Sequence, residues 1–150
     1  MARRRARELA FQALFQAERG GSPVLEAWRD LRAEVAEEPE QEADYGEPLT
    51  RDDLDFAERL VGAFAAGKDA IDADLGALVV GWSFGQMAQT DLNVLRLALA
   101  ELSLAETPPA VAVEMAVRLA KRFGGEDSGR FVNGVLAKVL RRAAVAQGAA

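Results

Sequence analysis

The sequence predicts an all-α fold of about seven helices. The chain has 150 residues, half of them hydrophobic, which is enough to bury one core. Apolar residues recur at intervals of three and four through most of the chain, as on one face of a helix. No segment alternates convincingly between apolar and polar residues, as a half-buried strand would. We therefore expect residues 1–150 to form a single helical domain.

The first two helices are separated by glycine and proline. Residues 3–18 carry an apolar stripe at helical spacing. The GGSP run at 20–23 ends that helix, and Ser22 is expected to cap the next one, which carries apolar residues over 24–35. The stretch at 36–48 is acidic and contains two prolines and a glycine. It is expected to form a loop or a mobile insertion.

Two further helices are expected before residue 81. The TRDD run at 50–53 is a capping-type start, and the helix after it is predicted over 54–66. Gly67 is expected to break this helix, because glycine is a poor helix former. A shorter helix is then predicted over residues 69–80, followed by a linker at 81–85.

The next helix is strongly apolar. Thr90 or Asp91 is expected to cap it, and residues 92–102 are hydrophobic nearly all round, so the helix should be central. Prolines at 108–109 close it, because the residue before a proline disfavours helix. Another helix is predicted over 111–123.

The C-terminal part predicts helix, tight turn and helix over residues 117–140. The glycines at 124–125 permit the left-handed backbone that stops a helix. Asp127 or Ser128 can cap the helix that follows, because a short side-chain oxygen accepts from its first N–H groups. The tail at 143–150 is expected to be frayed.

Charge is segregated along the chain, whose overall net charge is −6. Residues 1–19 carry a net charge of +3, residues 37–58 of −9 and residues 118–142 of +5. Since electrostatic screening acts over about 8 Å at physiological salt, a basic face can act independently of a distant acidic one. The acidic total therefore does not exclude a nucleic-acid partner.

The composition excludes several function classes. The chain contains no cysteine and no histidine, so disulfides, thiolate metal sites and imidazole catalysis are ruled out. No apolar run approaches about 18 residues, so no membrane span is expected, and the first residues lack the features of a secretory signal. We expect a cytoplasmic protein without metal, cofactor or catalytic activity.

Basic and aromatic residues cluster around the C-terminal turn. Lys121, Arg122 and Arg130 supply cations, and Phe123 and Phe131 supply aromatic faces beside a helix N-terminus. Single-stranded RNA needs such a combination, with charge for phosphates and planes for unstacked bases. The competing interpretation is that both phenylalanines are core residues.

Three segments resemble the NusB family of bacterial transcription antitermination factors. They are RRRARELAFQALFQ at residues 3–16, DLNVLRLALAEL at 91–102 and VAVEMAVRLAKRFGGEDSGRFVNGVLAKVL at 111–140. The last segment, with its KRFGGEDSGRFVNGVL core, is the most specific. Residues 20–80 match no motif of the family that we can quote.

The resemblance implies a fold of two small packed helical subdomains and a role as a non-catalytic RNA-binding adaptor. The family binds the boxA element of nascent RNA together with NusE, a ribosomal protein of the small subunit. It supports transcription of ribosomal RNA operons by the elongation complex. Some members form homodimers that hide the RNA face, and the sequence leaves a homodimer open here.

The resemblance also implies site residues. The family's arginine-rich N-terminus and its RNA-facing helix junction fall on Arg3, Arg4, Arg5, Arg7, Phe123, Asp127, Ser128, Arg130 and Phe131. The NusE-facing segment falls near Asp91 and the turn before it, which contains Trp82 and Phe84. For these residues to form one RNA site, the first helix must pack beside the last helix or its junction. We therefore predict that Arg7 lies on the same face as Arg130 and that Phe131 is not fully buried.

The chain departs from the family pattern at a few positions. Gln86 and Leu92 stand where a basic residue is common, and Glu114-Met115 stands where Asn-Glu is usual. These differences affect the polar details of the partner surface.

Two alternative functions remain open from the sequence. One is an accessory module, because the same helical domain occurs fused to ribosomal RNA methyltransferases. This chain has no G-x-G-x-x-G motif for binding S-adenosylmethionine in the usual way. The other is a self-associating scaffold that does not bind RNA. For Asp127 the alternative to an RNA contact is a simple helix cap.

Overall fold

The computed structural model describes residues 3–37, 49–79, 81 and 84–148. Within these residues the chain forms six α-helices and one short 3₁₀ helix, and no strand. The elements in chain order are α1 Arg4–Gly20, α2 Val24–Glu37, α3 Arg51–Leu78, η1 Phe84–Gln86, α4 Gln89–Leu104, α5 Pro109–Gly124 and α6 Glu126–Gly148. The all-α prediction is confirmed. None of the described helices is both long enough and apolar enough to cross a membrane.

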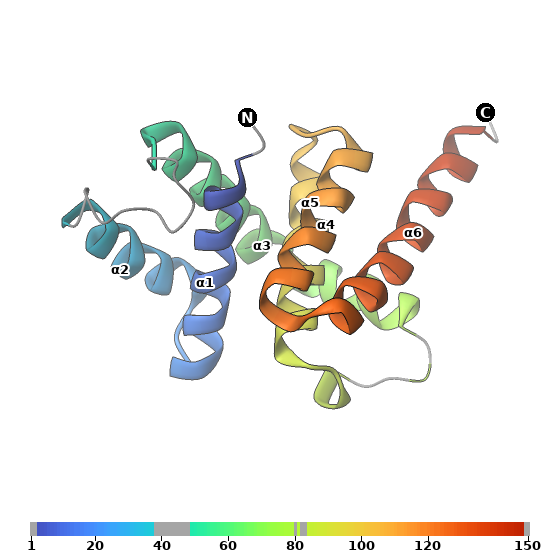
Figure 1. Ribbon diagram of the computed structural model, residues 1–150, viewed down its shortest axis with the longest axis horizontal. Coiled ribbons are helices and arrows are strands. Elements are labelled where there is room, and N and C mark those ends of the chain that lie inside the picture. Colours follow the sequence, from blue (N-terminus) through green and yellow to red (C-terminus); the bar gives the residue numbers. More distant parts are fainter. Residues whose placement is uncertain (1–2, 38–48, 80, 82–83, 149–150) are drawn as a thin grey trace.

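The helices form two packed groups, with α1, α2 and α3 on one side and α4, α5 and α6 on the other (Figure 1). Helix α4 packs against its own group and also against α1 and α3 of the other group, so it is the central element. Residues 92–101 of α4 are all buried, the polar ones included. This confirms the sequence prediction of an apolar central helix, because a helix that is hydrophobic nearly all round must be covered on every side.

Two bidentate ion pairs tie α4 to the first group. The Arg7 guanidinium donates to the Glu101 carboxylate at 2.8 and 2.6 Å, which joins α1 to α4. The Arg96 guanidinium donates to the Asp72 carboxylate at 2.9 and 3.0 Å, which joins α4 to α3. A planar guanidinium matches a carboxylate in both distance and direction, so each pair fixes the orientation of the helices it joins.

Helix α3 is continuous through Gly67, so the expected break there is wrong. The capping box at its start is confirmed, since Thr50 and Asp53 bond reciprocally. Burial continues across the glycine, from Phe64 to Ile71 and Leu75. A mid-helix glycine costs about 1 kcal/mol relative to alanine, and tertiary burial on both sides of Gly67 offsets that cost. Two expected helices are therefore one, which brings the count from seven to six.

Two helices begin earlier than their expected caps. The Leu92 N–H donates to the Ala88 carbonyl at 3.1 Å, which closes the first turn of α4 before Asp91. Asp91 therefore lies inside the first turn, where a carboxylate interacts favourably with the helix dipole. In the same way, the Gly129 N–H donates to the Gly125 carbonyl at 3.1 Å, so α6 begins at Glu126.

Two helices also end later than expected. Helix α2 includes residues 36 and 37, so only the first two residues of the expected acidic loop are described, and 38–48 lie outside the described part. Helix α6 continues through Gly148, beyond residue 143, where we expected the ordered part to end. Alanine is the best helix former, and the sequence from Ala143 to Ala146 is rich in it.

Candidate nucleic-acid interface

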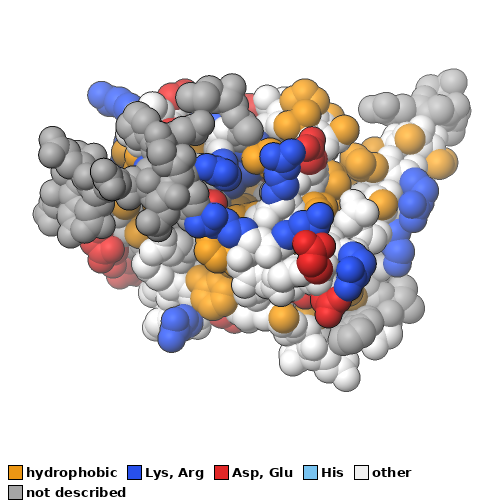
Figure 2. All heavy atoms as spheres, viewed as in Figure 1, with side chains coloured by type: hydrophobic (Ala, Val, Ile, Leu, Met, Phe, Trp, Pro, Cys, Tyr) orange, Lys and Arg blue, Asp and Glu red, His pale blue; other side chains and the backbone are white. Residues whose placement is uncertain are grey.

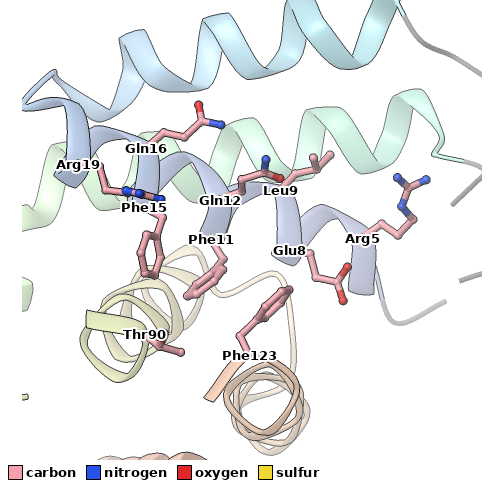
Figure 3. A pocket seen from close by; sticks show the side chains of 10 residues that line it. All are labelled: Arg5, Glu8, Leu9, Phe11, Gln12, Phe15, Gln16, Arg19, Thr90 and Phe123. Atoms are coloured by element: carbon pink, nitrogen blue, oxygen red, sulfur yellow. The ribbon is translucent and has the colours of Figure 1, made fainter. Parts of the chain in front are cut away.

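A groove of about 620 Å³ runs between α1, the end of α5 and the start of α4 (Figure 3). Most of its lining comes from one side of α1, and the opposite wall comes from Phe123 and Thr90. The lining residues are Arg5, Glu8, Leu9, Phe11, Gln12, Phe15, Gln16, Arg19, Thr90 and Phe123. The groove thus combines aromatic rings, side-chain amides and two arginines.

Three phenylalanines form the floor and one wall of this groove, and their rings point toward one another (Figure 3). The Phe11 and Phe123 rings are stacked, with centroids 5.1 Å apart and an angle of 24° between their planes. The Phe15 ring meets Phe11 edge-on at 5.5 Å. Phe11 is buried, whereas Phe123 is 45% exposed. An exposed ring whose inner face is already supported by another ring is pre-organised to stack on a planar ligand.

Close packing at the α5–α6 junction sets the position of Phe123. A Cβ on Gly124 would collide with the Ser128 side chain, and a Cβ on Gly129 would collide with the Lys121 side chain. Glycine at both positions therefore lets the start of α6 fold back tightly against the end of α5. Gly125, with φ +90°, provides the turn between them. Phe123 is the last side chain of α5 before this turn, so it projects from the end of the helix toward α1.

Cations surround the aromatic groove. Arg5 and Arg19 lie at opposite ends of it, about 21 Å apart along α1 at 1.5 Å rise per residue (Figure 3). The Arg122 guanidinium lies 5.5 Å from the Phe123 ring centre and forms an ion pair with Glu8 on α1 at 3.3 Å. Arg4 and Arg118 line a smaller hollow next to the groove. Lys and Arg side chains gather over α1 and the adjoining end of α5 and start of α6 on this face (Figure 2).

Two of the predicted N-terminal arginines are engaged in contacts within the protein, Arg7 as a buried residue and Arg3 as a half-buried one. Arg7 is 5% exposed, and its guanidinium is committed to Glu101. The prediction that Arg7 shares an exposed face with Arg130 is therefore wrong. Arg3 lies 4.4 Å from the ring centre of Phe56 and forms an ion pair with Asp52 at 3.4 Å. Four arginines within five consecutive positions cannot all point outward, because one helix presents different sides at successive positions.

The predicted residues at the α5–α6 junction separate into exposed and packed ones. Lys121, Asp127 and Arg130 are exposed, and the last two form an ion pair with each other. Ser128 is buried, and its hydroxyl donates to the Gly124 carbonyl at 3.2 Å. Phe131 is half-buried and packs against the core. It is not fully buried, as predicted, but Phe123 presents the more exposed ring.

The predicted partner surface is described only at Asp91. Asp91 is half-buried in the first turn of α4, and its Oδ1 atom accepts no hydrogen bond from the described residues. Trp82 lies outside the described residues. For Phe84 the structure describes the backbone, which is part of η1.

The groove side of α1 was not predicted from the sequence. Phe11 and Phe15 widen the apolar stripe of residues 3–18, and Phe11 is buried in the core, but the stripe alone did not predict that they line a groove together with Gln12 and Gln16. The signal was present: two aromatic residues and two amides each stand four residues apart, next to one another on the same helix. Arg19 and Thr90 carry no local signal for a ligand, because only the tertiary fold brings them to the groove.

A second ionic cluster, away from the groove, joins the start of α1, helix α3 and the connection between α4 and α5. The Arg59 guanidinium donates to the Glu106 carboxylate at 2.8 and 2.9 Å. These hydrogen bonds lower the pKa of Glu106 and raise that of Arg59. Arg3 also approaches Glu106, at 3.9 Å. Within the described residues, no group of His, Cys, Asp or Glu has an arrangement that could hold a metal ion.

Comparison with known proteins identifies the family. The NusB family model matches residues 4–141. The chain belongs to the NusB family. Two relatives, each named transcription antitermination protein NusB, come from Thermus thermophilus and Deinococcus deserti. The first is 47% identical over 145 residues, covering 97% of this chain and 94% of the relative. The second is 49% identical over 140 residues, covering 93% and 80%.

Solved structures agree with this family assignment. A crystal structure of the antitermination factors NusB and NusE in complex with double-stranded RNA matches with a TM-score of 0.77 and 26% identity. That match covers 94% of this chain and 97% of the other. NusB of T. maritima matches with a TM-score of 0.75 and 30% identity, covering 93% and 90%. The prediction of the family is confirmed, together with its two-subdomain all-α fold.

Proposed function

We propose that this chain is a NusB-type antitermination factor that binds boxA-type single-stranded RNA in the groove between α1 and α5. The observation that supports this best is the exposed Phe123 ring, stacked on Phe11 in a groove with arginines at its two ends. The Phe123 ring contacts Phe11 on one face and is 45% exposed, so it leaves ring surface accessible to a planar ligand. An RNA base supplies the missing planar partner.

Each part of the groove has a distinct task in this proposal. Phe123 stacks on an unstacked base, and Phe15, on the other side of Phe11, offers a second ring. Each stacked base contributes about 1–3 kcal/mol. Arg5 and Arg19 neutralise phosphates at the two ends. Gln12 and Gln16 offer amide donors and acceptors to base edges. Lys121 and Arg130, which are exposed on the neighbouring junction, extend the cationic surface. Asp127 offers a carboxylate to exocyclic amines of the bases.

Arg7 and Ser128 act on this site indirectly. Arg7 anchors α1 to α4 through Glu101, and Ser128 ties the first turn of α6 to the end of α5. The first contact fixes α1 relative to α4, which carries Thr90, and the second holds the end of α5, which carries Phe123. Phe131 supports the junction from the core side, and its exposed part contributes less to stacking than Phe123 does.

The proposed protein partner is a NusE-type ribosomal protein that docks at the start of α4. Asp91 is half-buried in the first turn of α4, and its negative charge would attract a cationic side chain of the partner. Its Oδ1 atom is buried and has no donor among the described residues, so docking would have to bring a donor to this carboxylate. Trp82 and Phe84 precede it in sequence and would add apolar contact. RNA and this partner together would bring the chain to the transcription elongation complex in the cytoplasm, where it acts as an adaptor rather than as an enzyme.

A titration with a short boxA-like RNA tests the function directly. The RNA is titrated with and without NusE, at two salt concentrations. We expect weak binding by the chain alone, a shallow decrease of affinity with salt, and tighter binding when NusE is present. Each phosphate contact on a single strand adds about 0.7 to the slope of log affinity against log salt. Absence of RNA binding under all four conditions would contradict the proposal.

A charge reversal at Asp91 tests the partner surface. Asp91→Lys is expected to weaken NusE binding more than it weakens RNA binding by the isolated chain, because it adds like-charge repulsion at the docking site. Asp91→Asn serves as the matched control, since it removes the charge without reversing it. If Asp91→Lys only lowers thermal stability and NusE still binds normally, Asp91 is a helix-dipole residue and the docking assignment fails.

A further inference from the structure

The C-terminal end of α6 presents an apolar helix surface that the family assignment does not explain. The family model matches up to residue 141, and α6 continues to Gly148. Residues 143–146 are alanines and one valine, and all four are exposed. Val145 is 70% exposed, more than any other large hydrophobic side chain described. An aliphatic helix end of this kind indicates an interaction surface when it borders a shaped hollow.

Such a hollow lies between this end of α6 and the end of α3. We call it the α3–α6 groove; its volume is about 620 Å³, and Leu78 and Val145 stand on its two sides. Two contacts hold its walls in place. The Lys138 ammonium donates to the Leu78 carbonyl at 3.3 Å, which also satisfies an open carbonyl at the end of α3. Arg142 forms an ion pair with Asp74 at 3.4 Å.

The charged side chains that line the α3–α6 groove are all basic. Lys138, Arg141 and Arg142 line it, and none of its lining residues is acidic. The rest of the lining is aliphatic and mostly small, including Ala77 and Ala146. Small side chains let another backbone approach closely, and cations beside an aliphatic strip favour a ligand that carries apolar and acidic positions together.

We propose that the α3–α6 groove binds an acidic amphipathic helix of a partner protein. The groove has no aromatic side chain among its lining residues, so it lacks the stacking surface that single-stranded RNA needs. A helix fits because Lys138, Arg141 and Val145 follow one another at three- and four-residue spacing and form a ridge along α6. The partner's apolar side chains would cover Val145, and its carboxylates would meet Arg141 and Lys138.

The groove is remote from the RNA site along the same helix. Helix α6 starts at the RNA-site junction with α5 and ends beyond the α3–α6 groove, and its 23 residues span about 34 Å (Figure 1). A partner in the α3–α6 groove and an RNA in the α1–α5 groove therefore do not compete for the same surface. Binding of one should leave binding of the other nearly unchanged.

A designed peptide pair tests this proposal on the full chain. The probe is a fluorescein-labelled 16-residue helix of Leu, Ala and Glu, with Leu at positions i, i+3, i+4 and i+7. The control peptide has Lys in place of every Glu. Fluorescence polarisation measures binding to the unaltered chain and to three variants, Arg141→Glu, Val145→Ser and Arg29→Glu. The last variant makes the same charge change on the exposed face of α2, away from both grooves.

The proposal expects the acidic peptide to bind and the basic peptide not to bind. Arg141→Glu should weaken binding of the acidic peptide by about tenfold or more, because it places like charges together. Val145→Ser should weaken it by a smaller factor, of roughly three, and Arg29→Glu by less than that. Equal effects of Arg141→Glu and Arg29→Glu would overturn the proposal, as would equal binding of both peptides or no binding of either. A loss of boxA-like RNA affinity in Arg141→Glu with peptide binding unchanged would also overturn it and assign the groove to RNA.

Discussion

Arg5 and Arg7 stand two positions apart on α1 and have opposite surroundings. Arg5 lines the aromatic groove with Phe123, whereas Arg7 is buried and bonded to Glu101 of α4. Successive helix positions turn by about 100°, so two residues of the same type within one arginine run reach different sides. The groove side of α1 is available to a ligand, and the inner side holds the two helix groups together.

The largest expected effect is a loss of stability on replacing Arg7, on the inner side of α1. Arg7→Ala should lower the free energy of unfolding by about 3–5 kcal/mol, because it leaves the Glu101 carboxylate buried without its ionic partner. Urea unfolding followed by circular dichroism measures this change. Arg4→Ala, at an exposed position of the same helix, is the control and should change stability by about 0.5 kcal/mol or less.

A double replacement separates the buried charge from the packing. Arg7→Met with Glu101→Leu should recover most of the lost stability, because apolar residues of similar volume often replace a buried ion pair at little cost. If Arg7→Ala costs no more than Arg4→Ala, Arg7 is not a structural residue and the contrast between the two sides fails.

The next largest expected effect is a loss of RNA affinity on replacing Phe123, which faces the groove side of α1. Phe123→Ala should weaken the binding of boxA-like RNA by about 1–3 kcal/mol. The slope of log affinity against log salt should stay nearly unchanged, because stacking releases no counterions. Fluorescence titration at several salt concentrations measures both quantities. Leu25→Ala, at an exposed hydrophobic residue of α2, is the control and should change neither. Phe131→Ala should weaken RNA binding less than Phe123→Ala.

A smaller effect is expected at Arg5. Arg5→Ala should reduce the salt slope by about 0.7, the contribution of one phosphate contact on a single strand, with a modest loss of affinity. The same titrations measure it. Arg7→Met with Glu101→Leu, which keeps the inner side packed, should leave the slope unchanged. Equal flattening by both variants would mean that Arg7 contacts phosphate and that the two sides of α1 do not differ in function.

The smallest expected effect concerns pH and the ionic cluster of Arg59 and Glu106. Hydrogen bonds from Arg59 lower the pKa of Glu106 in the folded protein. The folded state therefore binds fewer protons at this site than the unfolded state, and the stability gained above the ordinary pKa is lost as pH falls through the lowered one. Thermal unfolding between pH 7 and pH 3 should show a slightly smaller acid-induced loss for Glu106→Gln than for the unaltered chain. An identical or larger loss would contradict this assignment.

The sequence was sufficient for the fold class and for the family, and less so for element boundaries. Periodicity identified the helices, and the apolar character of residues 92–102 identified the central one, in which residues 92–101 are buried. Gly67 misled the prediction because local propensity is weaker than burial of Phe64 and Ile71 on both sides of it. The caps expected at Thr90 or Asp91 and at Asp127 or Ser128 lie too late in the sequence, because backbone hydrogen bonds close the first turns at Ala88 and Gly125.

The candidate site was predictable only in part. The turn at the end of α5 and Phe123 were identified from local composition. The buried role of Arg7 depends on Glu101, which lies 94 positions away in the sequence, so no local pattern could reveal it. The groove also needs Thr90 from α4, whose position follows from packing between helices. Residues that share a helix could be grouped in advance, whereas residues from different helices could not.

A nuclear magnetic resonance titration tests the central claim most directly. A short boxA-like RNA is added to the isotopically labelled chain, and the side-chain signals of Phe123, Phe15 and Gln12 are followed together with the backbone amides. The account predicts that these signals shift with saturation, whereas the amides around Arg7 and Glu101 change little. RNA binding that leaves the signals of Phe123 and Gln12 in place, with shifts confined to other surfaces, would contradict it.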